Sequence, residues 1–256
     1  MTDRRVTPDP RYVDDQTPAR VGVPVVDLLA APHGARDRQL LAGDPVTVLG
    51  THDAHSYVRS EKDGYIGWVA ATALAADAAP THVVTALASH AYAAATFKSP
   101  DRATLSFGAR LVARGVRDGY LDTAYGYVPA QHVSPADWQA DDPVQVAALF
   151  LGTPYLWGGN SRLGLDCSGL IQAALLACGH ACPGDSDQQQ ALGRAATGAV
   201  QRGDLLFWKG HVAIAVDDQT LIHANAYAMA TVYEPLAQAV ARIAETDGPV
   251  LARRRL

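Results

Sequence analysis

Short apolar runs separated by turn residues characterise the first half of the chain. The segments 45–49, 56–59 and 66–69 are rich in valine, isoleucine and aromatic residues, and glycine or aspartate separates them. Runs of this length and composition are typical of β-strands joined by tight turns. An alanine-rich stretch at 70–80 ends in a proline and is interpreted as a linker. This part of the chain is therefore predicted to be all-β.

A weak internal repeat runs through this β-rich part. The sequence GYVP at 126–129 repeats the pattern of GWVA at 67–70, and LSFG at 105–108 echoes LLAG at 40–43. Two copies of one unit with several short strands predict two small β-barrels in tandem. The polar, proline-containing residues 1–19 are expected to form a loosely ordered arm.

The pattern changes after residue 141. Asp142 and Pro143 precede a helix-like apolar segment, and proline suits the first turn of a helix. Residues 167–178 place apolar side chains on one helical face, and Gly179 is a suitable end for that helix. Three strand-like runs follow, at 204–208, 211–216 and 220–224. Helices followed by neighbouring antiparallel strands predict an α+β domain.

Composition and charge narrow the class of protein. Of the 256 residues, 48% are hydrophobic and 18% are charged, so the chain can bury a core. The formal net charge of -5 argues against nucleic acid as a partner, because a phosphate-binding surface needs a basic excess. No apolar run reaches about 18 residues, so we expect no transmembrane helix and no membrane partner. The N-terminal residues have no apolar core for a signal peptide, and the expected location is the cytoplasm.

The three cysteines are Cys167, Cys178 and Cys182. An odd number without paired spacing fits free thiols in a reducing compartment. No pattern of further ligands completes a zinc site around Cys178 and Cys182, so no metal and no cofactor is expected. Packing at the end of the helix is the expected role of these two side chains.

Cys167 lies where a glycine-rich loop becomes a helix. The free N–H groups and the positive end of such a helix stabilise a thiolate, lower the thiol pKa and can bind an oxyanion. A buried structural cysteine is the alternative, but it does not need Gly158, Gly159 and Gly164 before it. The position therefore favours a nucleophile.

Two of the nine histidines lie on the predicted C-terminal strands. With a three-residue turn at 217–219, Ala213 faces His223, and His211 and His223 share one face of the sheet. A two-residue turn would instead place the two histidines on opposite faces. We expect Cys167 to be the nucleophile, His211 the base and then the acid, and His223 the group that orients His211, as in the logic of papain.

Four sequence features together resemble the NlpC-type cell-wall cysteine peptidases. They are DCSGL at 166–170, GHVAI at 210–214, His223, and PYLWGG at 154–159. The resemblance covers about residues 138–256. The upstream half is similar to the two bacterial SH3-like domains that precede the catalytic domain in the γ-D-glutamyl-L-diaminopimelate endopeptidases, or dipeptidyl-peptidases VI.

This resemblance implies an α+β papain-like catalytic domain, with helices packed on an antiparallel sheet, preceded by two small SH3-like β-barrels. The expected division is an arm at 1–19, the first barrel at 20–76, the second at 80–137 and the peptidase domain at 138–256. The implied activity is hydrolysis of the γ-D-glutamyl-diamino acid bond in free murein peptides with an N-terminal L-Ala, in peptide recycling. In that branch the first barrel caps the site and excludes longer substrates.

Substrate contacts within the catalytic domain are also implied by the resemblance. Tyr155 is expected to place its hydroxyl near the oxyanion, and Trp157 to line the pocket. Asp166 and Ser168 are expected to bind the D-Glu part, and Ser186 to contact substrate as well. A structural role is the alternative for two of them, because Asp166 and Ser186 also occupy positions that suit helix caps.

Two further contacts are implied in the first barrel. Tyr65 matches a tyrosine that faces the substrate, and Asp37 stands where the family has a glutamate that pairs with the substrate ammonium. Aspartate is one methylene shorter, and a solvated turn residue is the alternative. In the second barrel Ala124 aligns with Tyr65, which indicates a structural role for that copy.

Three other functions are alternatives to this one. A wall-bound peptidoglycan hydrolase would use the SH3-like domains as anchors, whereas a degenerate peptidase would only sense wall peptides. An acyltransferase would use the same Cys-His chemistry on lipid. The complete cysteine and histidine set disfavours a mere sensor, and no apolar channel or membrane anchor is evident for lipid.

Overall fold

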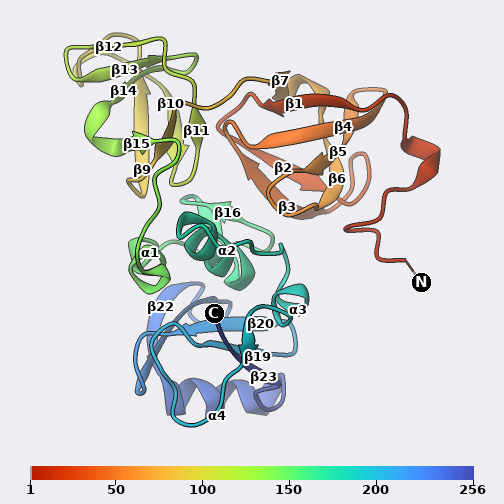
Figure 1. The fold of residues 1–256 in the computed structure, drawn as a ribbon, viewed down its shortest axis with the longest axis vertical. Coiled ribbons are helices and arrows are strands. Elements are labelled where there is room, and N and C mark those ends of the chain that lie inside the picture. The colour runs from red at the N-terminus through yellow and green to blue at the C-terminus, as the bar shows by residue number, and fades with distance from the viewer. Residues whose placement is uncertain (1) are drawn as a thin grey trace. The chain divides into compact units, whose positions relative to one another are not determined.

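The computed structural model describes residues 2–256, and the chain divides into two compact units (Figure 1). The first unit is Met1–Trp138 and the second is Gln139–Leu256. Each unit has buried apolar clusters of its own. None of the described helices is long and apolar enough to cross a membrane.

The first unit begins with a seven-stranded sheet in the order β3-β2-β6-β5-β4-β1-β7. Its strands are β1 (Thr17–Val21), β2 (Val25–Leu29), β3 (Arg36–Leu41), β4 (Pro45–His52), β5 (His55–Ser60), β6 (Ile66–Ala70) and β7 (Leu74–Ala76), with a 3-10 turn, η2 (Ala71–Ala73). Alternate side chains of these strands, such as Leu28, Leu40 and Val58, meet in one buried cluster.

The residues before this sheet are packed against it, which differs from the loosely ordered arm that the sequence indicates. A 3-10 turn, η1 (Pro10–Tyr12), places the Tyr12 ring edge-on to Trp68, with ring centroids 5.0 Å apart. The N–H of Ile66 donates to the Arg5 carbonyl at 2.7 Å. Aromatic packing and strand-like hydrogen bonds therefore order a segment whose proline content predicted little structure.

The second part of the first unit contains a five-stranded sheet, β10-β9-β14-β13-β12, and a three-stranded sheet, β11-β8-β15. The strands are β8 (His82–Val84), β9 (Ala88–Tyr92), β10 (Asp101–Ser106), β11 (Arg110–Leu111), β12 (Gly115–Arg117), β13 (Tyr120–Thr123), β14 (Gly126–Pro129) and β15 (Val133–Pro135), with a 3-10 turn, η3 (Ala130–His132). Strands β6 and β14, which carry the sequence repeat, are each followed by a 3-10 turn and a short strand.

Gly43, in the turn between β3 and β4, lies where the two parts of the first unit are in contact. Its φ is +76°, and an added Cβ would lie 2.1 Å from the Arg110 carbonyl oxygen. Beside it, the Arg110 N–H donates to the Ala42 carbonyl at 2.7 Å. Only glycine fits both the positive φ and the close approach of the neighbouring chain.

The second unit begins with the predicted order of helices followed by antiparallel strands. It comprises α1 (Pro143–Leu149), β16 (Asn160–Ser161), β17 (Gly164–Leu165), α2 (Cys167–Ala177), α3 (Ser186–Gln189), β18 (Arg194–Ala195), β19 (Leu205–Trp208), β20 (His211–Ala215), β21 (Thr220–Asn225), β22 (Ala230–Pro235), α4 (Leu236–Thr246) and β23 (Ala252–Arg255). The further helix α4, which follows β22, was not predicted. The strands form a six-stranded sheet in the order β18-β23-β19-β20-β21-β22. Helices α1 and α2 lie on one side of this sheet and α4 on the other (Figure 1).

Both ends of α2 have well-formed caps. At the N-terminus the Asp166 carboxylate accepts the Gly169 N–H at 2.7 Å, which satisfies one of the free donors of the first turn. At the C-terminus Gly179 has a φ of +77°, and the N–H of His180 donates to the Leu175 carbonyl at 3.0 Å. This is the glycine-terminated pattern that the sequence indicates, and it fixes where the helix ends.

Candidate active site

The register of β20 and β21 brings His211 and His223 together. Ala215 pairs with Leu221, and the Val216 N–H donates to the Thr220 carbonyl at 2.8 Å, which closes a three-residue turn. The predicted turn length is confirmed, and the two histidines share one face of the sheet. Nε2 of His211 lies 2.9 Å from Nδ1 of His223.

Cys167 is the first residue of α2, and its side chain is 5% exposed. Its sulfur lies 3.9 Å from the Gly210 carbonyl oxygen and accepts a hydrogen bond from the Val212 N–H. These two groups flank His211 on the chain, so the sulfur lies against the beginning of β20. In the part of the chain that the structure describes, the side chains of Cys167 and His211 share no hydrogen bond.

The thiol of Cys167 does not have the lowered pKa that its helix position predicts. Burial, followed by the neighbouring Asp166 carboxylate, raises its pKa to about 12. Backbone N–H groups of Val212, Ser168 and Cys167 itself act in the opposite direction but do not outweigh burial. A thiolate that leaves water loses more solvation than one helix end returns.

Both histidines are held neutral. Burial, with the neighbouring His223 and then Arg242 as smaller causes, lowers the pKa of His211 to about 3. Burial also lowers the pKa of His223 to about 4, although the Glu234 carboxylate opposes that change. The resting pair at neutral pH is therefore a thiol beside a neutral imidazole.

A carboxylate and a guanidinium continue the chain of contacts beyond His223. Oε2 of Glu234, on β22, lies 2.9 Å from Nε2 of His223. Arg242, on α4, donates to both carboxylate oxygens of Glu234, with Nε–Oε1 at 3.0 Å and Nη2–Oε2 at 2.6 Å. The sequence analysis did not identify either residue.

The family comparison decides the identity of the region that holds these contacts. The family model described as NlpC/P60 family matches residues 152–242, which include Cys167, His211 and His223. The second unit is an NlpC/P60 domain. The model described as bacterial dipeptidyl-peptidase SH3 domain matches residues 28–74, so an SH3 domain precedes the NlpC/P60 domain.

Two curated relatives are similar over part of their length. The chain is 35% identical over 135 residues to the gamma-D-glutamyl-L-lysine dipeptidyl-peptidase of Bacillus subtilis (strain 168), which covers 46% of each chain. It is 36% identical over 110 residues to dipeptidyl-peptidase 6 of Lysinibacillus sphaericus, covering 42% of this chain and 41% of that protein. Each match therefore spans less than half of the relative's own length.

A solved structure shares the fold over nearly the whole chain. It is the crystal structure of an NlpC/P60 family protein from Bacillus cereus ATCC 10987, with a TM-score of 0.77 at 22% identity. The similarity covers 93% of this chain and 99% of that chain.

Within the NlpC/P60 domain, Tyr155 lies near the nucleophile position. Burial, and then the nearby Cys167 and Asp166, raise the pKa of its hydroxyl, which therefore stays protonated and able to donate. Trp157 follows in the same loop, and it is 68% exposed. Its predicted contact with substrate stays a prediction.

Asp166 and Ser168 make structural contacts inside the NlpC/P60 domain. The Asp166 carboxylate accepts hydrogen bonds from the Gly158 N–H at 2.9 Å and from the Ser168 hydroxyl at 2.9 Å, in addition to its cap of α2. The cap expected of Asp166 is thus present. The Asp166 carboxylate and the Ser168 hydroxyl are therefore already engaged in hydrogen bonds within the domain, and a D-Glu group that binds here has to share them.

Ser186 is the first residue of α3 rather than its cap. Asp185 holds the N-cap position, so the cap expected of Ser186 is wrong by one residue. Ser186 is buried, and Gln189 three residues later donates to the carbonyls of Ser168 and Pro183 at 3.0 Å each. This glutamine, which the sequence analysis did not single out, ties α3 to the beginning of α2.

The two predicted contact residues of the first unit have partners within that unit. Tyr65 belongs to the buried cluster of the first sheet, and the Arg38 guanidinium lies 5.8 Å from its ring centroid. Asp37 forms a two-point ion pair with Arg4, at 2.6 Å and 3.0 Å. Their contacts with a substrate stay predictions.

Proposed function

We propose that this protein is a cysteine peptidase that hydrolyses the γ-D-glutamyl-diamino acid bond of small murein peptides with a free N-terminal L-Ala. The observation that carries the proposal is the contact of the Cys167 sulfur with the backbone on both sides of His211. The 2.9 Å contact between His211 and His223 supports it further. The names of the two curated relatives support the choice of bond.

The first step is attack by sulfur on the γ-carbonyl carbon of D-Glu. As the S–C bond forms, the Cys167 proton passes to Nδ1 of His211, because Nε2 of that ring is directed at His223. The carbonyl oxygen becomes an oxyanion, and we assign its stabilisation to the N–H groups at the start of α2 and to the Tyr155 hydroxyl.

The second half of the cycle returns the enzyme to its starting state. The protonated His211 gives its proton to the leaving amine, the C–N bond breaks, and a thioester remains on Cys167. A water molecule, deprotonated by His211, attacks the thioester carbon. The C–S bond then breaks, the thiol is restored, and L-Ala-D-Glu leaves as a free dipeptide.

The remaining parts of the proposal concern selection of the substrate. Asp166 and Ser168 bind the D-Glu part, Trp157 lines the pocket, and Ser186 also contacts the substrate. Asp37 pairs with the substrate ammonium, Tyr65 faces the substrate, and the first barrel excludes longer chains. Residues 80–137 form a second SH3-like barrel with a structural role. A free peptide substrate fits recycling in the cytoplasm.

The test compares the wild-type protein with Cys167→Ala on L-Ala-γ-D-Glu-diaminopimelate and on the L-lysine peptide, followed by mass spectrometry. We expect L-Ala-D-Glu from the wild type and less than about one part in 10³ of that rate from the variant, because the nucleophile is lost. An N-acetylated peptide should resist cleavage.

Two outcomes contradict parts of the proposal. Unchanged turnover by Cys167→Ala removes the nucleophile assignment. Comparable cleavage of intact sacculi and free tripeptide favours a wall-bound hydrolase with anchoring SH3-like domains over a recycling enzyme.

A further inference from the structure

We propose that Glu234 is a positioning residue that selects the ring tautomer of His223 and, through it, leaves Nδ1 of His211 free to accept the Cys167 proton. This inference rests on the proposed function, because it explains how the histidine pair is prepared for catalysis. It assigns no contact between Glu234 and substrate.

The direction of the hydrogen bonds follows from Glu234. An ionised carboxylate only accepts, so the 2.9 Å contact requires the hydrogen of His223 on Nε2. Nδ1 of His223 is then a bare acceptor, and the 2.9 Å contact with His211 requires a hydrogen on Nε2 of His211. Since a neutral imidazole carries one ring hydrogen, Nδ1 of His211 has none.

Asn225 favours the opposite tautomer, which makes the choice depend on Glu234. Its Oδ1 accepts the Ala228 N–H at 2.7 Å, so its amide nitrogen is the atom that lies 2.8 Å from Nε2 of His223. That amide donates only to a His223 ring whose Nε2 carries no hydrogen. A charge-assisted bond is about twice as strong as a neutral one, so Glu234 prevails over Asn225.

Arg242 keeps Glu234 in the ionised form that this selection needs. Burial raises the pKa of Glu234, but the hydrogen bonds and charge of Arg242, together with His223, leave that pKa below its usual value. The Arg242 guanidinium also lies over the Tyr227 ring, 4.4 Å from the ring centroid, which fixes its position from the other side.

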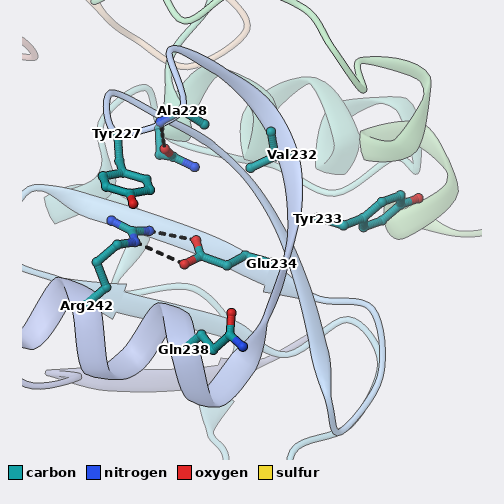
Figure 2. A pocket seen from close by; sticks show the side chains of 8 residues that line it. Tyr227, Ala228, Val232, Tyr233, Glu234, Gln238 and Arg242 are labelled. Atoms are coloured by element: carbon teal, nitrogen blue, oxygen red, sulfur yellow. Dashed lines mark hydrogen bonds and ion pairs between the residues drawn. The ribbon is translucent and has the colours of Figure 1, made fainter.

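The outer side of this ion pair opens on a cavity of about 410 Å³ (Figure 2). Tyr227, Tyr233, Gln238 and the Glu234–Arg242 pair line it. Figure 2 shows the two residues joined by dashed lines below Tyr227, with Gln238 on the nearby turn of α4. A small carboxylate can therefore reach the place of the Glu234 side chain from this cavity once that side chain is shortened.

The first experiment replaces the charge and keeps the shape. We expect Glu234→Gln to lower kcat by about 100-fold or more with little change in KM, because the Gln amide and Asn225 both favour the wrong His223 tautomer. Gln238→Ala, which changes the same cavity without touching His223, is the matched control and should keep the wild-type kcat. Glu234→Asp should recover part of the loss.

Chemical rescue separates a positional role from a structural one. Glu234→Ala should be inactive in chloride and regain at least about 10-fold in kcat with formate or acetate at equal ionic strength. The wild type should not respond to either anion. A Glu234→Gln protein that unfolds more easily but keeps its kcat would show that Glu234 is only structural, and it would overturn the inference.

A readout that needs no turnover keeps this inference apart from the proposed function. Long-range ¹H–¹⁵N NMR of the histidine rings reports which nitrogen carries hydrogen, and we expect Nε2–H for His223 in the wild type and Nδ1–H in Glu234→Gln. The same tautomer in both proteins contradicts the inference. If the tautomer differs between the two proteins as expected but the wild type cleaves no peptide, the inference about Glu234 holds and the proposed function is wrong.

Discussion

The surroundings of Cys167 have opposing effects on the pKa of its thiol. The start of α2 and the Val212 N–H favour a thiolate, whereas burial and Asp166 favour the thiol and prevail. Because His211 is also held neutral, the resting site stores no charge-separated pair. Proton transfer then accompanies attack on the substrate rather than preceding it.

This balance predicts how Cys167 reacts with iodoacetamide as pH changes. Because the thiol pKa is about 12, the thiolate fraction and the alkylation rate should rise about tenfold per pH unit from pH 6 to 9, without a plateau. Site-resolved peptide mass spectrometry follows Cys167 separately from Cys178 and Cys182. A rate that is flat from pH 5 upward indicates a preformed thiolate and contradicts the raised pKa.

At the same scale, some residues of the candidate site could be identified from the sequence and others could not. Cys167, His211 and His223 could be placed from a glycine-rich loop, a helix start and strand alternation, all of which are local patterns. Glu234 and Arg242 could not, because their role depends on the register of β22 and on how α4 packs against the sheet. Most charged residues are exposed to solvent, so the sequence alone does not distinguish Glu234 and Arg242 from ordinary surface residues.

At the scale of elements, the hairpin between β20 and β21 determines whether the site exists. A three-residue turn at 217–219 was expected from the sequence, and the pairing of Ile214 with Ile222 confirms it. The next hairpin sets Glu234 behind His223, and its pairing of His223 with Val232 needs a turn at 226–229 that carries no strong turn signal. The first turn could be predicted from its residues, and with it the His211–His223 pair. The second turn could not, and so the position of Glu234 could not be predicted either.

The cap of α2 provides a prediction that joins helix structure to reactivity. Asp166→Asn removes the charge that raises the Cys167 pKa, so alkylation of Cys167 at pH 8 should become several-fold faster. The Asn amide nitrogen cannot replace the oxygen that accepts the Gly158 N–H. The free energy of unfolding of Asp166→Asn, measured by urea denaturation, should therefore be about 1 kcal/mol lower than that of the wild type.

Asp185→Asn is the matched control for that change. Asp185 holds the N-cap position of α3, and its side chain makes no capping hydrogen bond. It should leave the alkylation rate unchanged. Equal alkylation rates in Asp166→Asn and the wild type would show that the carboxylate does not act on the sulfur.

At the scale of the whole molecule, the two units have separate cores and different sequence signals. The α+β pattern of the second unit is periodic and local, so the helix at 167–177 and the three strands at 205–225 could be predicted, whereas α4 was not. The packing of residues 4–14 against the first sheet could not, because Tyr12 meets Tyr57 and Trp68 only after the chain has folded. Long-range aromatic contacts leave no periodic trace in a sequence.

Separate cores predict two transitions in calorimetry. Tyr12→Ala should lower the stability of the first unit by about 2 kcal/mol and shift one transition, because the ring packs on Trp68 from the side. Val6→Ala, in the same arm but 46% exposed, should shift neither. A single transition that moves as a whole in Tyr12→Ala contradicts the independence of the cores.

The ion pair between Arg4 and Asp37 has a consequence for any cation that comes to that carboxylate. Asp37 is 14% exposed and Arg4 is 57% exposed, so the arginine can leave while the aspartate stays in place. A peptide amine that binds there exchanges one positive partner for another. The number of neutralised charges stays the same, and affinity at this position should therefore change little between dilute buffer and strong salt.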